Sequence, residues 1–346
     1  MWSEIVGALR AKENLSRKQI RSAMVAILSG EAGEPEIKDF LLGLKEKGET
    51  AEEVNELVEV MYEYSTPISI PDRAVDVVGT GGDGFNTINI STAAAIVTTA
   101  AGARVIKHGN RAATSQTGSA DLLAELGINI ELEPKEVEES VRKIGIGFAF
   151  APKFHPAMRF AAPARKALGV PTIFNILGPL ANPARPKAVA IGVARREMFE
   201  LVARVIAERG GEGFVFRGDE GLDEISIAGT TSIYQINEGT YRICQFDPTE
   251  IGIEKFQIDD IKGGNPKENA AVVERVFRGE RNGAREAVLL NAAAAIAAFK
   301  GDFFLPVETQ LANGYVLAKS AIDSGRASDL VQRWREFSNR FKKSSL

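Results

Sequence analysis

The sequence is poor in the residues that form disulfides and zinc sites. Among its 346 residues there is one cysteine, Cys244, and there are two histidines. A disulfide within the chain needs two cysteines, and a structural zinc ion takes four Cys or His ligands in most proteins. We therefore expect no disulfide within the chain and no structural zinc site built from these residues alone.

The chain also lacks a long apolar run. Residues 1–14 include Glu4 and Arg10, which interrupt any apolar core of the signal-peptide kind. The most apolar stretch, residues 289–299, is far shorter than the roughly 20 residues that span a bilayer. The sequence predicts a cytoplasmic protein with no membrane partner.

An excess of positive charge is absent as well. Lys plus Arg number 42 and Asp plus Glu number 46, so the net charge is −4. A general nucleic-acid binder needs a basic surface, and we expect no nucleic-acid partner. Any polyanionic ligand must then be held locally, by backbone amides, a few basic side chains or a metal ion.

The first sixty-odd residues predict helices only. Ser16 with Gln19, and Thr50 with Glu53, have the spacing of a capping box, in which two side chains satisfy free backbone N–H groups at a helix start. Apolar residues at helical spacing follow both pairs. Three short helices without a strand predict a small all-helical domain over residues 1–65.

Beyond residue 73 the pattern changes to alternating strands and helices. Such alternation predicts a mostly parallel central sheet flanked by helices. The expected fold is therefore α/β, with a large domain over residues 73–346 and with helices from about 160–185 joining the helical domain. The pattern predicts strands at 74–78, 105–106, 147–150, 188–193 and 213–216, an alternating segment at 128–132, hairpin-like strands within 225–246, and helices at 91–101, 120–126, 134–144, 155–169 (kinked at Pro163), 195–209, 269–277, 285–299 and 329–346.

A glycine-rich loop at residues 77–92 joins a predicted strand to a predicted helix. Glycines let the backbone approach a ligand closely, and the free N–H groups of a helix start favour phosphate. Gly79, Gly81 and Gly84 satisfy the dinucleotide pattern, but no acidic residue follows Gly84 before Asp121, so the ribose-binding acid is missing. A plain tight turn is the alternative. The polar residues of this loop favour ligand binding instead; they are Asp83, Asn89, Ser91 and Thr92.

A second polar loop, residues 107–121, follows the next predicted strand. The carboxyl ends of neighbouring parallel strands meet at one edge of a sheet, where open α/β sheets bind ligands. His108 suits either a general base or a residue that positions substrate, and the lack of an evident Asp or Ser partner favours positioning. The side chains suited to phosphate or ribose oxygens are Lys107, Asn110, Ser115 and Ser119.

For two further groups of residues, the sequence alone leaves the role open. The acidic segment 217–226 ends in Asp223 and Glu224, which suit magnesium, but a solvated acidic loop is the simpler interpretation. Arg165 has a planar fork that matches a benzoate-type carboxylate. An exposed helix arginine is the alternative, and the sequence alone favours it.

Taken together, these motifs resemble the anthranilate phosphoribosyltransferase family, within the wider superfamily of nucleoside phosphorylases and phosphoribosyltransferases. The resemblance rests on Gly-Thr-Gly-Gly-Asp, Asn-x-Ser-Thr, Lys-His-Gly-Asn-Arg with Gly-Ser-Ala-Asp, Asn-Ile-Leu-Gly-Pro-Leu and Asp-Glu-Ile-Ser, and it runs over nearly the whole chain. Three alanines depart from the family pattern without removing a presumed ligand group; they are Ala112, Ala113 and Ala181.

The resemblance implies an enzyme that transfers the phosphoribosyl group of phosphoribosyl pyrophosphate to anthranilate in tryptophan biosynthesis, as a homodimer through the helical domain. It implies stabilisation of the transition state by Lys107, Asp223 and Glu224, and two magnesium ions at Ser91, Asp223 and Glu224. For anthranilate it implies Gly79, His108, Asn110, Arg165 and Pro179, the last within the substrate-lining segment 174–186. For phosphoribosyl pyrophosphate it implies Gly79, Gly82, Asp83, Thr87, Asn89, Ser91, Thr92, Lys107, Ser115 and Ser119.

Two other functions remain open. A pyrimidine nucleoside phosphorylase of the same superfamily would use inorganic phosphate and no metal-bound diphosphate; the Asp223–Glu224 pair and the Asn-Ile-Leu-Gly-Pro-Leu segment argue against it. A non-catalytic relative that binds nucleic acid would need a basic surface, which the net charge of −4 disfavours.

Overall fold

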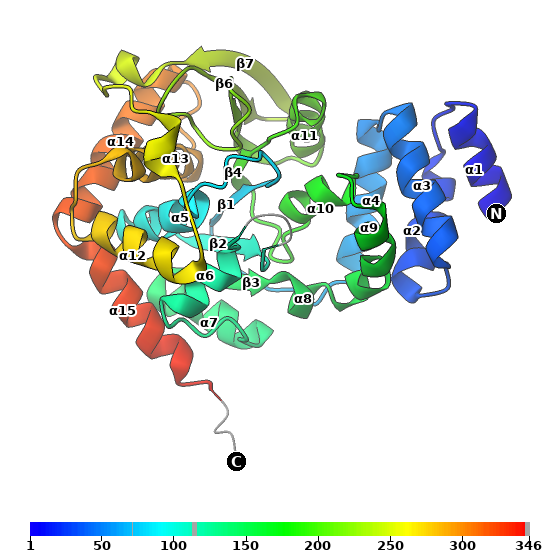
Figure 1. Ribbon diagram of the computed structural model, residues 1–346, viewed down its shortest axis with the longest axis horizontal. Coiled ribbons are helices and arrows are strands. Elements are labelled where there is room, and N and C mark those ends of the chain that lie inside the picture. The colour runs from blue at the N-terminus through cyan, green and yellow to red at the C-terminus, as the bar shows by residue number, and fades with distance from the viewer. Residues whose placement is uncertain (71, 113–115, 343–346) are drawn as a thin grey trace.

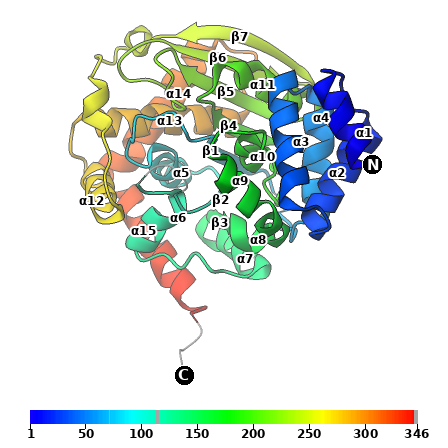
Figure 2. The ribbon, with the colours of Figure 1, turned by 45° about the vertical axis from the view of Figure 1, so that its right-hand side comes forward.

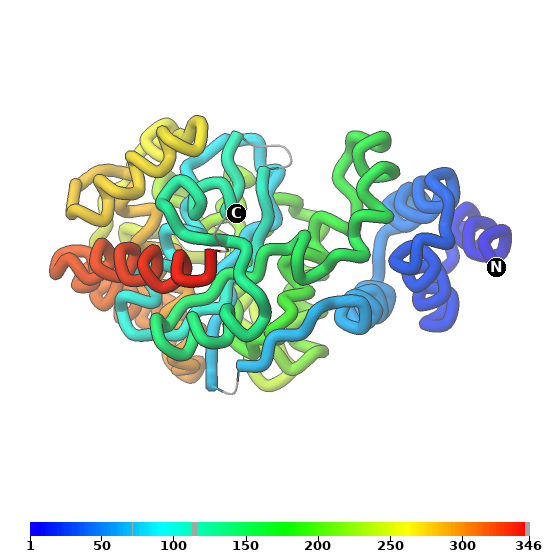
Figure 3. The backbone as a smooth tube through the Cα atoms, turned by 90° about the horizontal axis from the view of Figure 1, so that it is seen from below, coloured from blue at the N-terminus to red at the C-terminus, as the bar shows by residue number. Residues whose placement is uncertain are grey.

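The computed structural model describes residues 1–70, 72–112 and 116–342. A helical part that holds the N-terminus lies beside a larger α/β part (Figure 1). Seen from below in Figure 3, the light-blue chain after the last N-terminal helix and the green chain in the middle of the sequence both run between the two parts. The parts are therefore joined by more than one segment.

The helical part contains one more helix than the sequence predicts. Both predicted capping boxes are present, at Ser16 with Gln19 and at Thr50 with Glu53. The unpredicted helix precedes them and has Met1 at its N-cap, with no side-chain cap to signal its start. The four helices are α1 (Trp2–Arg10), α2 (Arg17–Ser29), α3 (Glu34–Lys47) and α4 (Ala51–Glu63).

The α/β part is built on one seven-stranded sheet in the order β3-β2-β1-β4-β5-β6-β7. The first five strands pair in parallel, and β6 and β7 form an antiparallel hairpin at one edge. The predicted mostly parallel sheet is confirmed. Its strands are β1 (Val75–Gly79), β2 (Val105–Gly109), β3 (Ile146–Phe150), β4 (Ala188–Gly192), β5 (Glu212–Gly218), β6 (Thr231–Asn237) and β7 (Thr240–Phe246).

Helices cover both faces of the sheet. Successive residues of a strand point to opposite faces, and β4 illustrates this: Ala190 packs with the helices of one face, whereas Val189 and Ile191 join the core shared with the helical part. On that second face, α10 (Phe174–Leu180) and α11 (Arg196–Glu208) lie between the sheet and the helical part (Figure 2). The other helices are α5 (Ile90–Ala100), α6 (Ser119–Glu125), α7 (Pro134–Ile144), α8 (Ala151–Phe154), α9 (Ala162–Leu168), α12 (Pro266–Phe277), α13 (Gly283–Lys300), α14 (Val307–Asp323) and α15 (Arg326–Asn339), with short 3₁₀ turns at Pro156–Phe160, Pro248–Ile251 and Ile258–Ile261.

Some predicted elements are wrong. Residues 128–132, for which only alternation was noted, form no strand; Ile128, Ile130 and Leu132 are buried, so the alternation reports burial and not sheet pairing. The predicted helix at 155–169 is two short pieces, a 3₁₀ turn at Pro156–Phe160 and α9, and Pro163 sits in the first turn of α9 without kinking a longer helix. Helix α14 was not predicted. The end of the predicted tail, residues 343–346, lies outside the described residues.

The middle of the chain packs against the N-terminal helices. Buried side chains of α9 and α10, among them Ala164 and Ile176, share one apolar core with α2 and α4. Tyr62 of α4 donates a hydrogen bond to the backbone oxygen of Leu180 at 3.1 Å.

Among the helices of the described ranges, none combines the length and the apolar character that crossing a bilayer requires.

Candidate active site

Both predicted ligand loops leave the same edge of the sheet. Strands β1 and β2 are parallel neighbours and end at Gly79 and Gly109, so the loops that follow them lie side by side. Gly81, Gly82 and Gly84 have φ of 66°, 79° and 82°, which side chains with a Cβ rarely adopt. The first loop is therefore an open backbone turn in front of helix α5, as the sequence predicts.

Asn89 ties the two loops together. It is the N-cap residue of α5, and its side-chain amide donates to the backbone oxygen of Thr117 in the second loop at 2.9 Å. Its side-chain oxygen accepts from Asn269 on α12 at 2.9 Å. Because its side chain is already engaged in these contacts, Asn89 acts in this structure as a brace between the loops.

Lys107 lies beneath the first loop. Its ammonium group is buried and donates to the backbone oxygen of Val77 and to Ser91 Oγ, the latter at 3.4 Å. Burial lowers the pKa of Lys107, and the nearby carboxyl groups of Asp76, Glu224 and Asp223 oppose that shift. The site thus has a basic group at its floor, directly below the helix start that the sequence predicts to bind phosphate.

A third segment, distant in sequence, completes this edge. Asp223 and Glu224 follow β5, and Asp223 Oδ2 accepts a hydrogen bond from the backbone N–H of Gly81 at 2.6 Å. Glu224 Oε1 accepts from the backbone N–H of Ser91 at 3.1 Å. The two residues are only 8% and 7% exposed, so the interpretation of this pair as a solvated acidic loop is wrong. Asp219 and Glu220 are exposed, as predicted.

Burial and mutual repulsion disfavour the charged forms of the carboxyl groups at this edge. Burial, together with the adjacent Asp83 carboxyl, raises the pKa of Asp223 to about 8. Burial and Asp223 raise the pKa of Glu224 well above its usual range. Asp83 Oδ2 is buried and has no hydrogen-bond partner among the described residues. Two buried acids with the half-buried Asp83 beside them favour the binding of a cation.

Magnesium fits this arrangement when a phosphate ligand shares it. Within the part of the chain that the structure describes, no group of three or more His, Cys, Asp or Glu side chains is arranged to bind a metal ion without other ligands. Mg²⁺ usually keeps several waters and binds through one or two carboxylates plus substrate phosphates. Asp223 and Glu224 can supply those carboxylates, and Ser91 Oγ lies within reach of Lys107 beside them.

Two glycines allow the carboxylate segment to approach the strands. A Cβ on Gly79 would lie 2.4 Å from Asp223 Oδ2, and one on Gly192 would lie 1.7 Å from the backbone oxygen of Asp223. The role of Gly192, at the end of β4, was not predicted. Its position at the carboxyl end of a predicted strand was the only signal in the sequence.

His108 is buried beside α10. Its Nδ1 is 2.9 Å from the backbone oxygen of Gly178, and because a carbonyl oxygen only accepts, Nδ1 carries the proton. Its Nε2 is buried and has no hydrogen-bond partner within the described ranges. Burial, with His155 at a ring distance of 5.1 Å, lowers the pKa of His108 to about 3. At so low a pKa the ring stays neutral near pH 7, and its unprotonated Nε2 can accept a hydrogen bond.

A buried polar cluster holds the strand that carries His108. Asp76 Oδ1 accepts from the backbone N–H of His108 at 3.2 Å, and Asp76 Oδ2 accepts from Asn182 at 2.8 Å. Asn182 also donates to the backbone oxygen of Ile106 at 2.9 Å. Asp76 and Asn182 were not predicted as site residues. A carboxyl group within an apolar strand was the available signal.

The other predicted acceptor residues lie on different elements. Arg165, on α9, is half-buried and lies 5.4 Å from the centre of the Phe174 ring; no carboxylate of the described residues pairs with it, and burial lowers its pKa. Pro179 lies inside α10, next to the Gly178 carbonyl that holds His108. Asn110 is exposed on the second loop, where its side-chain oxygen accepts from the backbone N–H of Arg111.

The remaining predicted donor-site residues lie along the two loops. Thr87 forms an isolated bridge with Lys262, Ser119 begins α6, and Thr92 is buried in the first turn of α5 with its hydroxyl unpartnered among the described residues. Gly82 is exposed at the tip of the first loop. Ser115 lies outside the described residues.

His108 should make the stability of the protein depend on pH. Its pKa of about 3 in the folded state lies below the usual value near 6.5, so between these pH values only the unfolded chain takes up the proton. Stability is therefore lost as the pH falls below about 6.5. For His108→Gln we expect this loss to be shallower by up to ~1.4 kcal/mol per pH unit. Urea unfolding at several pH values from 7.5 down to 5 measures both slopes; equal slopes would contradict a buried, neutral His108.

Two family models match the chain. Residues 3–65 match the glycosyl transferase family helical bundle domain, and residues 71–328 match the glycosyl transferase family α/β domain. Among individual relatives, the anthranilate phosphoribosyltransferase of Rhodococcus jostii (strain RHA1) is 47% identical over 338 residues, which are 98% of this chain and 93% of that one. The enzyme of the same name from Streptomyces griseus is 46% identical over 338 residues, 98% of this chain and 95% of that one.

Solved structures give the same result. Anthranilate phosphoribosyltransferase from Thermus thermophilus superposes with a TM-score of 0.89 at 37% identity, covering 97% of this chain and 99% of that one. The Saccharomyces cerevisiae enzyme, in complex with phosphoribosyl pyrophosphate and magnesium, has a TM-score of 0.88 at 27% identity, with 98% of each chain covered. With these matches over nearly its full length, the chain belongs to the anthranilate phosphoribosyltransferase family.

Proposed function

We propose that this protein transfers the 5-phosphoribosyl group of phosphoribosyl pyrophosphate to the amine of anthranilate, giving N-(5-phosphoribosyl)anthranilate and pyrophosphate in tryptophan biosynthesis. The observation that carries this proposal is the meeting of three segments at one sheet edge: the glycine loop, the buried Lys107, and the buried pair Asp223 and Glu224. Family membership supports the same reaction.

The donor site is proposed along the two loops. The backbone N–H groups near Gly82 and the start of α5 would hold phosphate oxygens, with the positive end of the helix dipole behind them. The nearby Lys107 would add positive charge from below. The full proposed set is Gly79, Gly82, Asp83, Thr87, Asn89, Ser91, Thr92, Lys107, Ser115 and Ser119.

Magnesium is proposed as the cofactor, held by Asp223, Glu224 and Ser91 together with the diphosphate. When bound, it neutralises diphosphate oxygens and so stabilises pyrophosphate as the leaving group. The solved yeast relative was crystallised with phosphoribosyl pyrophosphate and magnesium, which supports this choice. We propose two ions per site, because Asp223 and Glu224 bond to different backbone groups, Gly81 and Ser91, and so point at different parts of the loop.

The acceptor site is proposed around His108, beside α10. There the unprotonated Nε2 of His108 can accept a hydrogen bond from the anthranilate amine, and Arg165 can receive the carboxylate. Gly79, Asn110 and Pro179 complete the proposed set. A yeast relative was solved in complex with 4-fluoroanthranilate, which supports an aromatic acid as the acceptor.

The reaction then needs little acid–base chemistry from the protein. The bond from C1 of the ribose to the pyrophosphate oxygen breaks, the bond from C1 to the anthranilate nitrogen forms, and one amine proton leaves. An aryl amine is nucleophilic when neutral, so no protein base is required. The protein would act by holding the amine in line and by stabilising the departing charge through Lys107, Asp223 and Glu224.

A fluorescence assay tests the proposal directly. Anthranilate is fluorescent, and its loss in the presence of phosphoribosyl pyrophosphate and magnesium follows the reaction, with a coupled step consuming the product. We expect turnover that stops when EDTA removes the metal. Failure to consume anthranilate, combined with cleavage of uridine or thymidine in inorganic phosphate, would favour the pyrimidine nucleoside phosphorylase. A gel shift at moderate salt would test the nucleic-acid alternative.

Replacing Arg165 by Ala should weaken anthranilate binding selectively. One charge-assisted, bidentate contact with a carboxylate is worth about 1.5–3 kcal/mol, so we expect KM for anthranilate to rise roughly 10- to 100-fold. KM for phosphoribosyl pyrophosphate should stay close to wild type. Lys166→Ala, an exposed neighbour on the same helix, is the matched control. An effect of Arg165→Ala confined to the phosphoribosyl donor would reject the role assigned to Arg165.

Three further features belong to the proposal. We propose a division into a small domain of residues 1–65, joined by helices from about 160–185, and a large domain of residues 73–346; the packing of α9 and α10 against α2 and α4 supports it. A homodimer through the helical domain follows from the family resemblance, and sedimentation equilibrium tests it. A cytoplasmic location accompanies the biosynthetic reaction, and fractionation of source cells tests it.

A further inference from the structure

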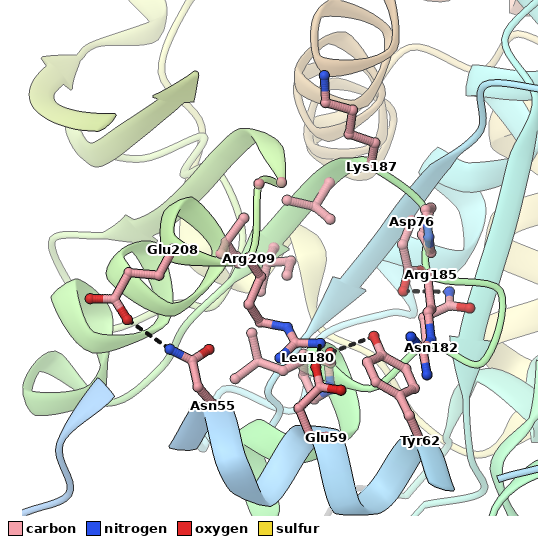
Figure 4. Close-up of a pocket in the computed structure, with 17 residues that line it drawn as sticks. Asn55, Glu59, Tyr62, Asp76, Leu180, Asn182, Arg185, Lys187, Glu208 and Arg209 are labelled. Atoms are coloured by element: carbon pink, nitrogen blue, oxygen red, sulfur yellow. Dashed lines mark hydrogen bonds and ion pairs between the residues drawn. The ribbon is translucent and has the colours of Figure 1, made fainter. Parts of the chain in front are cut away.

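A cavity of about 560 Å³ separates helix α4 from the sheet on the side away from the substrate loops (Figure 4). Its walls come from α4, from the end of α10 and the segment after it, from the end of α11, and from the residues that lead into β4 and β5, among them Lys187, Gly210 and Gly211. These lie where the parallel strands begin, whereas the glycine loop lies where β1 ends. Of the described residues proposed for substrate and metal, only Pro179 also lines this cavity, so the cavity is largely separate from the proposed substrate site.

The charged side chains around the cavity have polar partners, with one exception. Glu59 pairs with Arg209 at 2.6 Å, Glu208 pairs with Arg204 at 2.7 Å, and Lys187 pairs with Glu212 at 3.0 Å. Arg185 makes no ion pair and no side-chain hydrogen bond among the described residues. Its guanidinium lies 4.0 Å from the centre of the Tyr62 ring, which is also 5.3 Å from the guanidinium of Arg209.

The backbone of Arg185 is held in an unusual conformation. Its φ is +49°, in the left-handed region that residues with a Cβ rarely adopt. Pro186 follows it, and a residue before proline normally takes an extended conformation. Such outliers persist only where the surrounding structure enforces them, and they concentrate at sites with a function. Here the enforced turn presents a charged group, already stacked on an aromatic ring, to the cavity.

The lining mixes charged and apolar side chains. Leu180, Val189, Ile191 and Ile206 line the cavity together with Pro179. Pockets of about 300–1,000 Å³ that combine an apolar lining with a few oriented polar groups are typical of small-molecule sites. We propose that this cavity is a second ligand site, specific for a small carboxylate with an apolar body, whose carboxylate pairs with Arg185 and whose body lies on the apolar lining.

Hexanoate is a suitable probe, and its uncharged analogue hexanamide is the matched ligand control. Binding to the full-length protein is measured by saturation-transfer NMR up to about 20 mM, since one ion pair with a small apolar body gives millimolar affinity at best. We expect hexanoate to bind, hexanamide to bind at least fivefold more weakly, and saturating anthranilate to leave hexanoate binding unchanged.

Arg185→Gln should weaken hexanoate binding at least fivefold. Arg340→Gln is the matched protein control, because Arg340 is also exposed and lies 6.0 Å from the centre of an aromatic ring, that of Phe337. Each variant is checked by its thermal unfolding midpoint. The proposal is overturned if hexanoate does not bind, if anthranilate displaces it, or if Arg185→Gln, with an unchanged unfolding midpoint, binds hexanoate as the wild type does.

Discussion

Replacing Asp223 by Asn together with Glu224 by Gln is expected to lower magnesium-dependent turnover by about a thousandfold or more. Removing a single group that stabilises developing charge in an active site costs about 10²–10³ in kcat, and this variant removes two. Both carboxyl groups are buried and accept hydrogen bonds from backbone N–H groups of the glycine-rich loop. Turnover measured across a magnesium titration, with phosphoribosyl pyrophosphate in excess, gives the effect.

The same variant also separates a metal role from a structural one. The amide side chains keep an oxygen that can accept from Gly81 and Ser91, and they remove the buried charge and the repulsion that together raise the pKa of Asp223. The folded state should therefore be as stable as in the wild type. The matched control is Asp219→Asn with Glu220→Gln, an exposed acidic pair in the same segment. Unchanged turnover with unchanged magnesium dependence in the buried-pair variant would reject the metal assignment.

Replacing Gly192 by Ala should disable the site although it leaves every proposed ligand side chain chemically unchanged. The added Cβ would lie 1.7 Å from the backbone oxygen and 2.4 Å from the backbone carbon of Asp223, far inside contact distance. The segment that carries Asp223 and Glu224 must then move. A displacement of about 1 Å of catalytic groups costs about 100-fold in rate, and overpacking costs about 1–3 kcal/mol of stability.

Steady-state kinetics and urea unfolding test this expectation together. Gly7→Ala is the matched control, because a Cβ at Gly7 meets nothing within 4 Å and the residue lies on the exposed side of α1. Both measurements are made at a temperature where the variant is folded. We expect kcat to fall by more than the loss of stability can account for. Wild-type turnover in folded Gly192→Ala would show that the two segments are not in close contact.

Local signals in the sequence were reliable for helices whose ends are marked by capping side chains. The capping boxes at Ser16 and Thr50 mark their helices correctly, because the pairing of side chain and backbone is made within one turn. Helix α1 has no side-chain cap and was missed. Residues 128–132 alternate and are buried, yet no neighbouring strand pairs with them. Alternation reports which side chains face a core, and it does not report hydrogen-bonded neighbours.

Some residues of the candidate site could likewise be placed from local patterns in the sequence, and others could not. The two loops could be placed together from the sequence because both follow parallel strands that are close in order, and β1 and β2 are neighbours in the sheet. The surroundings of Asp223 and Glu224 could not be derived from their residue types, which favour a solvated loop. Only the family resemblance assigned them to the site, and their burial under the loop depends on a contact between residues more than 130 positions apart.

Residue order and type were therefore sufficient for the alternation of helix and strand, for the glycine turn at Gly81 and Gly84, and for the edge at which both loops meet. Folding in three dimensions settled which carboxyl groups are buried, which nitrogen of His108 carries its proton, and why Gly192 must lack a side chain. The reason is physical: local patterns arise from interactions within a turn or a strand, whereas pKa values and close backbone contacts depend on atoms that only packing brings together.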